Sequence, residues 1–188
     1  PELILDVKDL HYSEHGVTKV DKVNFSIRGG EILGVAGVQG NGQEQLIKAI
    51  TGLIPFQDGT VKLAGTEIQG MNIAQKRDAG MSYIPEDRMI DGSAPAASIQ
   101  DNLISTCYEQ PKYSGKIFLK QSVIREESQE LIDRFSIKTQ SEKEKVSALS
   151  GGNIQKVVVA REWNNKPKLM IAEQPTRGID IGSAAYIH

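Results

Sequence analysis

Cysteine and histidine are scarce in this sequence of 188 residues, which has one cysteine and three histidines. A lone cysteine, Cys107, excludes an intramolecular disulfide and makes a reducing compartment the simpler expectation. The histidines at positions 11, 15 and 188 are too scattered to build a metal site among themselves. The sequence therefore points away from a disulfide scaffold and from histidine-based metal chemistry.

Long apolar runs and an excess of one charge are also missing. No apolar run approaches the roughly 18 residues that a membrane span needs, and the opening PELILDV lacks the basic region of a signal peptide. With 22 basic and 24 acidic side chains the formal charge is −2, so no electrostatic footprint for nucleic acid is present. A composition of 39% hydrophobic and 24% charged residues is that of a globular domain, and we expect an intracellular α/β protein.

Strand patterns alternate with helical ones along the chain. Residues 31–37 (EILGVAG) are almost wholly apolar and end in glycine, which is typical of a strand buried on both faces of a mostly parallel sheet. The helix after them should stop at Gly52. Half-buried or short strands are predicted at residues 3–10, 23–27, 60–64 and 81–85, and a second apolar strand at residues 168–172.

The region from about 95 to 165 is more polar and helical. A stripe formed by Val123, Ile124, Leu131, Ile132 and Phe135 indicates one helix, and residues 153–163 indicate another. This order predicts a sheet core with a helical subdomain at 95–165 inserted into one domain spanning 1–188. The missing initial Met and the stop at His188 suggest a domain that is incomplete at its C-terminal edge.

A glycine-rich loop joins the apolar strand at 31–37 to the next helix. Glycines let backbone N–H groups turn inward, and a helix N-terminus adds partial positive charge for an anion, so this context suits a phosphate-binding P-loop. A glycine-rich turn without any ligand is the alternative. The candidate nucleotide-binding residues are Gly37, Val38, Gln39, Gly40, Asn41, Gly42, Gln43, Glu44 and Gln45.

The side chains of this loop depart from a functional P-loop at two positions. Gln43 stands where a P-loop has lysine, and Glu44 stands where it has the serine or threonine that binds Mg²⁺. A lysine about 4 Å from a phosphate oxygen gains roughly 4 kcal/mol at an effective dielectric near 20, whereas a hydrogen bond to a charged acceptor contributes about 1.5–3 kcal/mol. We therefore expect weakened nucleotide binding, with Glu44 a candidate Mg²⁺ ligand.

A second candidate anion site is the segment LSGGN before the helix at 153–163. Ser150 can cap that helix, and Gly151 and Gly152 expose N–H groups at its positive end, ahead of Asn153. Taken alone, Ser-Gly-Gly before a helix is commonly only a cap. Its place about 20 residues before KLMIAEQPTRGID makes the order of the motifs specific.

The strand at 168–172 ends in two polar residues. A functional P-loop ATPase has an aspartate for Mg²⁺ at the first of these positions and a catalytic glutamate at the second. Glu173 keeps a carboxylate and is a candidate Mg²⁺ ligand, but Gln174 cannot act as a base. These two catalytic positions are therefore altered as well.

With these residues in place, the chain resembles the nucleotide-binding domain of an ABC transporter. Five ordered stretches carry the resemblance: GEILGVAGVQGNGQEQL, YIPEDR, DNL, LSGGNIQK and AEQPTRGIDIG. The details are similar to the C-terminal half of the tandem ATP-binding subunits of simple-sugar and nucleoside importers. The resemblance implies an ABC ATPase core with a mostly parallel sheet, antiparallel N-terminal strands and an inserted helical subdomain.

The resemblance also implies roles for individual residues. Glu86 matches the loop that couples to the membrane subunits, and Asp180 matches the loop that crosses the dimer interface. Residues 150–153 match the signature that completes the partner domain's nucleotide site. Tyr12 is the nearest aromatic residue for stacking on adenine, although alignment on Asp9-Leu10 puts that role at Glu14. Arg88 and Arg177 lie inside matched motifs without an assigned role.

Taken together, the altered residues fall on the domain's own P-loop site, whereas its signature is intact. The resemblance then implies ATP and Mg²⁺ as cofactors, bound weakly or not at all by this chain alone, with little hydrolysis. The implied partners are an N-terminal ATP-binding half of the same polypeptide, transmembrane permease subunits and, indirectly, a substrate-binding protein. The implied location is the cytoplasm, on the inner face of the cell membrane.

One other reading stays open, and two more are disfavoured by the motifs. A structural or regulatory docking module that binds no nucleotide would fit Gln43 and Glu44. A soluble ABC protein of translation or DNA repair usually keeps the lysine and glutamate that are absent here. A P-loop kinase has no use for LSGG between its P-loop and its second strand.

Overall fold

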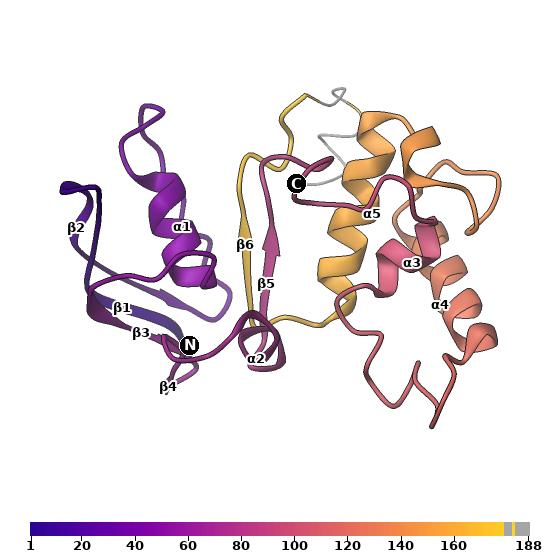
Figure 1. Ribbon diagram of the computed structural model, residues 1–188, viewed down its shortest axis with the longest axis horizontal. Helices are drawn as coiled ribbons and strands as arrows, with labels where there is room; N and C mark the ends of the chain where they lie inside the picture. Colours follow the sequence, from indigo (N-terminus) through magenta and orange to yellow (C-terminus); the bar gives the residue numbers. More distant parts are fainter. Residues whose placement is uncertain (179–181, 183–188) are drawn as a thin grey trace. The chain divides into compact units, whose positions relative to one another are not determined.

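The computed structural model describes residues 1–178 and 182, and it divides into two compact units. The first unit comprises Pro1–Ser82 and Pro167–Ile171, and the second comprises Tyr83–Lys166 and resumes at Ala172. Strands β5 (Met81–Ile84) and β6 (Leu169–Ala172) each cross the division. The mixed α/β class, with antiparallel N-terminal strands, is confirmed (Figure 1).

The largest element of the first unit is an antiparallel sheet. Its strands are β1 (Leu3–Glu14), β2 (Val17–Arg28), β3 (Asp58–Leu63) and β4 (Thr66–Glu67), in the order β2-β1-β3-β4. The β1–β2 hairpin turns at His15 and Gly16, both with positive φ (50° and 77°), as a two-residue hairpin loop requires. Alternate residues are buried on each side of a break in β1, Leu5 and Val7 before it and Leu10 and Tyr12 after it. The break lies at Lys8 and Asp9, where the register shifts and Asp9 has a φ of 50°.

Two short helices accompany this sheet. Helix α1 (Gln43–Thr51) buries Leu46 and Ile50 and ends at Gly52, whose φ is 85°, so the predicted stop is confirmed. Helix α2 (Ile73–Asp78) begins with a capping box, in which Asn72 and Gln75 each accept from the other's backbone N–H. Figure 1 shows α1 packed beside the strands of this unit.

The strand predicted at residues 31–37 is wrong for this structure. The segment has no regular structure, and its side chains are exposed, Ile32 to 97% and Val35 to 54%. An apolar segment becomes a buried strand only where neighbouring strands accept its backbone hydrogen bonds and other layers cover both faces. Within the described residues no strand pairs with it.

Helices are the main regular elements of the second unit. They are α3 (Ile99–Ile104), α4 (Gln121–Arg134), the 3₁₀ turn η1 (Val146–Ala148) and α5 (Gly151–Asn164). The predicted stripe on α4 is confirmed, because Ile124, Leu131 and Ile132 are buried while Val123 and Phe135 pack at the edge of the core. Leu131, Ile132 and Phe135 join one core cluster, with Ile99, Leu103, Ile137, Val146, Ile154, Val157 and Ala160. Ile124 and Val123 join another, with Ile104, Cys107 and Tyr113.

Strands β5 and β6 run parallel. Lys168 N donates to Gly80 O, and Glu173 N donates to Ile84 O at 2.9 Å, so the partners advance in the same direction along both strands. Glu173 and Gln174 follow directly after β6. Within the part of the chain that is described, no helix is long and apolar enough to cross a bilayer.

Candidate functional site

In the glycine-rich loop before α1, the side-chain amide of Gln43 lies against the loop backbone. Gly40 and Gly42 both have φ near 92°, which only glycine adopts without strain. Gln43 Nε2 donates to Val38 O at 3.3 Å. A Cβ at Gly37 would lie 1.8 Å from the same nitrogen, so the amide occupies the space directly above that glycine.

Other predicted residues of this loop have separate roles. Asn41 N donates to Val38 O at 3.2 Å, and Val38 is 74% exposed. Gly42 lies so close to Lys19 O that a Cβ there would stand 2.0 Å away. Gln39 is exposed and Gln45 is half-buried at the start of α1. The loop is thus shaped by glycines, as predicted, and the Gln43 amide lies against Gly37 and Val38.

Glu44, a predicted Mg²⁺ ligand, pairs with a lysine of its own helix. Its carboxylate pairs with Lys48 one turn later, Nζ to Oε1 at 2.6 Å. This is the Glu-to-Lys spacing that stabilises helices. Glu44 lies in the first unit and Glu173 in the second, so the predicted pair of Mg²⁺ ligands is not tested by either unit alone.

Glu173 and Gln174 stand at the carboxyl end of β6, where the sequence placed them. The Tyr83 hydroxyl donates to Glu173 Oε2 at 2.5 Å, and Gln174 has a positive φ of 42°. The described residues contain no group of three or more His, Cys, Asp or Glu that could hold a metal ion. Glu173 fits the alternative mode in which one carboxylate binds Mg²⁺ together with phosphate oxygens.

The signature segment forms the capped N-terminus of α5. Ser150 Oγ accepts from Asn153 N at 3.4 Å and from Asn153 Nδ2 at 2.9 Å. Asn153 Oδ1 in turn accepts from Lys138 N at 2.9 Å. The N–H groups of the first turn, where Gly151 and Gly152 lie, have no acceptor within the helix, so they present donors and partial positive charge to an anion.

Sequence reasoning missed the contacts made by the PEDR and PTRG segments. Glu86 forms an ion pair with Arg177. Arg88 donates to the carbonyl oxygens of Arg177 and Gly178, at 2.9 and 3.2 Å. The sequence shows only that charged residues occur in both segments, and no pattern in it indicates which of them pair.

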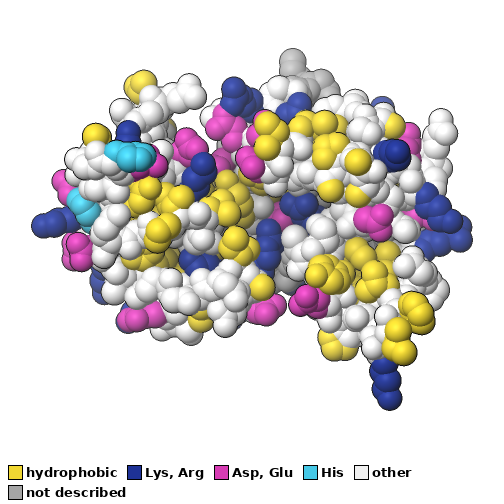
Figure 2. All heavy atoms as spheres, in the orientation of Figure 1, with side chains coloured by type: hydrophobic (Ala, Val, Ile, Leu, Met, Phe, Trp, Pro, Cys, Tyr) yellow, Lys and Arg dark blue, Asp and Glu magenta, His cyan; other side chains and the backbone are white. Residues whose placement is uncertain are grey.

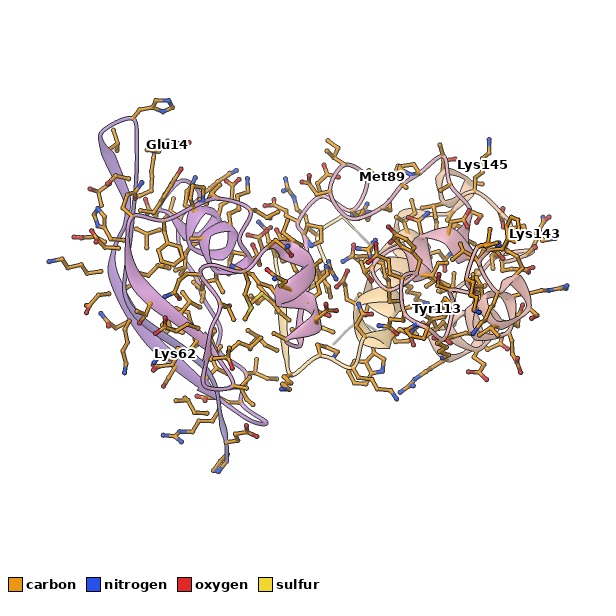
Figure 3. The ribbon with its side chains drawn as sticks, turned by 60° about the horizontal axis from the view of Figure 1, so that its bottom comes forward. Glu14, Lys62, Met89, Tyr113, Lys143 and Lys145 are labelled. Atoms are coloured by element: carbon orange, nitrogen blue, oxygen red, sulfur yellow. The ribbon has the colours of Figure 1, made fainter. Side chains whose placement is uncertain are left out.

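Two further predictions end differently. Tyr12 is buried in β1 at 8% exposure, so its ring packs in the sheet and has no open face for adenine. Glu14, at the end of β1, is labelled in Figure 3. Asp180 lies outside the described residues.

On the face drawn in Figure 2, basic and acidic side chains are interspersed, as the near-zero net charge suggests.

Comparison with known proteins identifies the family of this chain and several similar import proteins. The family model described as "ABC transporter" matches residues 20–177. The nucleoside import ATP-binding protein NupA of Lactococcus lactis is 38% identical over 188 residues, which cover 100% of this chain and 37% of that protein. The guanosine import ATP-binding protein NupO of Bacillus subtilis is 37% identical, over 92% of this chain and 34% of that protein.

Among solved structures, a nucleotide-free ATP-binding cassette from an ABC transporter has a TM-score of 0.80 at 22% identity. The match covers 98% of this chain and 74% of that one. A dimeric post-hydrolysis cassette bound to ADP and Pi has a TM-score of 0.78 at 19% identity, over 98% of this chain and 79% of that one. These likenesses show the fold, and the chain spans little more than a third of the curated relatives it matches.

Proposed function

Because the chain belongs to the ABC transporter family, we propose that it is part of the ATP-binding subunit of an importer for simple sugars or nucleosides. The observation that carries the proposal is the capped N-terminus of α5, where Ser150 and two glycines present backbone donors for an anion. The relatives named for nucleoside and guanosine import favour the nucleoside branch.

Within that subunit we assign this chain to the second, catalytically impaired half. Gln43 replaces the phosphate-binding lysine, and its amide lies over Gly37. Gln174 replaces the catalytic base. The chain would then bind ATP and Mg²⁺ weakly at its own loop and hydrolyse little there, while residues 150–153 complete the site of an N-terminal half of the same polypeptide.

The remaining partners follow from this role. Glu86 would face transmembrane permease subunits, which work with a substrate-binding protein, and the subunit would lie on the cytoplasmic face of the membrane. ATP and Mg²⁺ supply the phosphoryl chemistry when they are bound. This chain's residues contribute hydrogen-bond donors, at α5, and one carboxylate, at Glu173. The whole chain would be one cassette domain, with a helical subdomain at 95–165.

A docking module that binds no nucleotide is the second candidate, because the Gln43 amide lies against the glycine-rich loop. The two functions differ in what titration shows. A Mg²⁺-ATP titration of the full subunit should show a second, weaker site beside that of the N-terminal half if the proposal holds, whereas a docking module would leave a single site, with or without Mg²⁺.

The division of labour is tested by two variants of the reconstituted transporter. Restoring the altered residues, with Gln43→Lys and Gln174→Glu, should leave uptake nearly unchanged, because turnover takes place at the other site. Ser150→Arg should abolish both ATP turnover and uptake, because a bulky cation would block the N-terminus of α5. Normal ATP turnover in the Ser150→Arg transporter would overturn the proposal.

A further inference from the structure

One arginine of the second unit, in the PEDR segment, reaches two other motif segments that lie far from it in the sequence. Arg88 Nη1 donates to Arg177 O at 2.9 Å, and Arg88 Nη2 donates to Gly178 O at 3.2 Å. Both acceptors lie in the loop after β6, 89 and 90 residues along the chain. A planar guanidinium can donate to two acceptors at once, which a lysine ammonium does less well.

The same guanidinium lies against the signature. A Cβ placed on Gly151 would stand 2.8 Å from Arg88 Nη2 and 3.4 Å from its Cζ. Arg88 Nε is buried and makes no hydrogen bond within the described part of the chain. The glycine at the start of α5 thus leaves the room in which the arginine lies, between the helix N-terminus and residues 177–178.

The turn that carries Arg88 is held by side-chain hydrogen bonds to its backbone. Asp87 Oδ1 accepts from the backbone N–H groups of Met89 and Ile90, at 2.8 and 2.9 Å, and these bonds lower the pKa of Asp87. Ser93 Oγ donates to Arg88 O at 2.7 Å. Met89, on this turn, is labelled in Figure 3. Arg88 is therefore presented from a fixed backbone.

A second contact joins the same two loops. The carboxylate of Glu86 pairs with the guanidinium of Arg177, with side-chain exposures of 35% and 61%. An ion pair this exposed is weak by itself. The pair and the Arg88 hydrogen bonds nevertheless join the same two loops, so they restrict the same relative motion.

We propose that Arg88 is a positioning residue that ties the loop after β6 to the turn at residues 86–90, called the coupling turn after the role proposed for Glu86, and to the signature at the N-terminus of α5. Through it, a displacement of the coupling turn reaches residues 177–178 and Gly151 together. The consequence for transport rests on the proposed function, whereas the tie itself does not.

Trypsin tests the tie directly, because it cleaves after Arg177 and the carbonyl of that peptide bond is the one Arg88 holds. In the full subunit, without nucleotide, Arg88→Ala should speed cleavage after Arg177 by about tenfold or more, since proteolysis follows the population of the opened loop. Mass spectrometry would follow this product alone. Arg125→Ala is the matched control, because it removes another arginine of this unit, paired with Glu142 at 3.3 Å.

Arg88→Lys keeps the charge and the aliphatic stem but not the fork, so its cleavage rate after Arg177 should be intermediate. If Arg88→Ala unfolds the unit, cleavage rises at every site, and the lysine variant then decides. A rate after Arg177 that stays at the wild-type level in Arg88→Ala, or in Arg88→Lys when the alanine variant is unfolded, overturns the proposal.

The coupling consequence is measured in the reconstituted transporter as solute molecules taken up per ATP hydrolysed. Arg88→Ala should lower this ratio severalfold, with partial rescue by Arg88→Lys and no change in Arg125→Ala. An unchanged ratio in Arg88→Ala would overturn the coupling role. A wild-type transporter that shows no Mg²⁺-ATP-dependent uptake would instead overturn the proposed function, and the trypsin result would stand apart from it.

Discussion

Glu127 on α4 accepts hydrogen bonds from a cluster of buried polar groups, and its removal should destabilise the helical unit. Its Oε1 accepts from the Tyr113 hydroxyl and from Asn164 Nδ2, the latter at 2.6 Å, and its Oε2 pairs with Lys112. The Glu127 side chain is 9% exposed. Tyr113, labelled in Figure 3, lies among the helices and is buried, and burial together with its bond to Glu127 raises the pKa of its hydroxyl.

The size of the effect follows from which groups lose a partner. Glu127→Ala leaves the buried Tyr113 hydroxyl without its acceptor, at about 1–3 kcal/mol. It also removes one of the two acceptors of the half-buried Asn164 amide, which donates to the Tyr113 hydroxyl as well, at 3.1 Å. We expect a loss of about 3 kcal/mol in the free energy of unfolding. Glu127→Gln keeps an oxygen for both donors and loses the ion pair to half-exposed Lys112, so it should cost only about 1 kcal/mol.

The same carboxylate predicts a pH dependence with a definite sign. Burial raises the pKa of Glu127, but hydrogen bonds from Lys112, Tyr113 and Asn164 outweigh it, and the pKa lies below its ordinary value. A depressed carboxylate pKa stabilises the folded state above the unfolded-state value of about 4.3. The advantage of the wild type over E127Q should therefore hold at neutral pH and shrink as the pH falls through the lowered pKa.

Urea unfolding at pH 7 and at pH 3, followed by tryptophan fluorescence, measures both effects. Trp163 is the only tryptophan of the sequence and stands next to Asn164 on α5. Equal losses for E127A and E127Q at pH 7 would refute the reasoning about orphaned donors. A gap between wild type and E127Q that widens at pH 3 would refute the assigned direction of the pKa.

Three further changes are predicted. Ser150→Ala removes the cap of α5 and should lower the free energy of unfolding by about 1 kcal/mol, read from urea denaturation. Cys107 is 5% exposed and burial raises the pKa of its thiol, so an aromatic disulfide reagent should modify it slowly in the native state and rapidly in urea. Burial lowers the pKa of Lys76, whose Nζ donates to Ile50 O. Its charge is therefore penalised below the lowered pKa, so the wild type should gain stability relative to Lys76→Met as the pH rises from 7 towards 10, read as a shift in the difference between their melting temperatures.

Features set by local patterns were predictable from the sequence. The strands β1 and β2, the end of α1 at Gly52 and the apolar stripe on α4 each depend on residues within one or two turns of each other. The cap at Ser150 is equally local, because its partner Asn153 is three residues away. Even the Glu44–Lys48 pair has the i to i+4 spacing that a helix brings together.

The failures concern partners that are remote in the sequence. The apolar composition of residues 31–37 predicts a buried strand, but the segment is exposed in the structure. Its burial would depend on neighbouring strands that come from elsewhere in the sequence. The Glu86–Arg177 pair and the contacts of Arg88 join residues about 90 positions apart. No periodicity links such positions, so only the folded chain brings them together.

The two candidate anion sites differ in what holds them in place. The N-terminus of α5 is fixed by Ser150 and Asn153, by the Lys138 backbone and by the guanidinium over Gly151. The glycine-rich loop has the Asn41 backbone contact and the Gln43 amide that lies against it. An anion at α5 meets donors already in place, whereas one at the loop must first displace that amide. Preorganisation and charge therefore act in the same direction, which favours the signature as the stronger site of this chain.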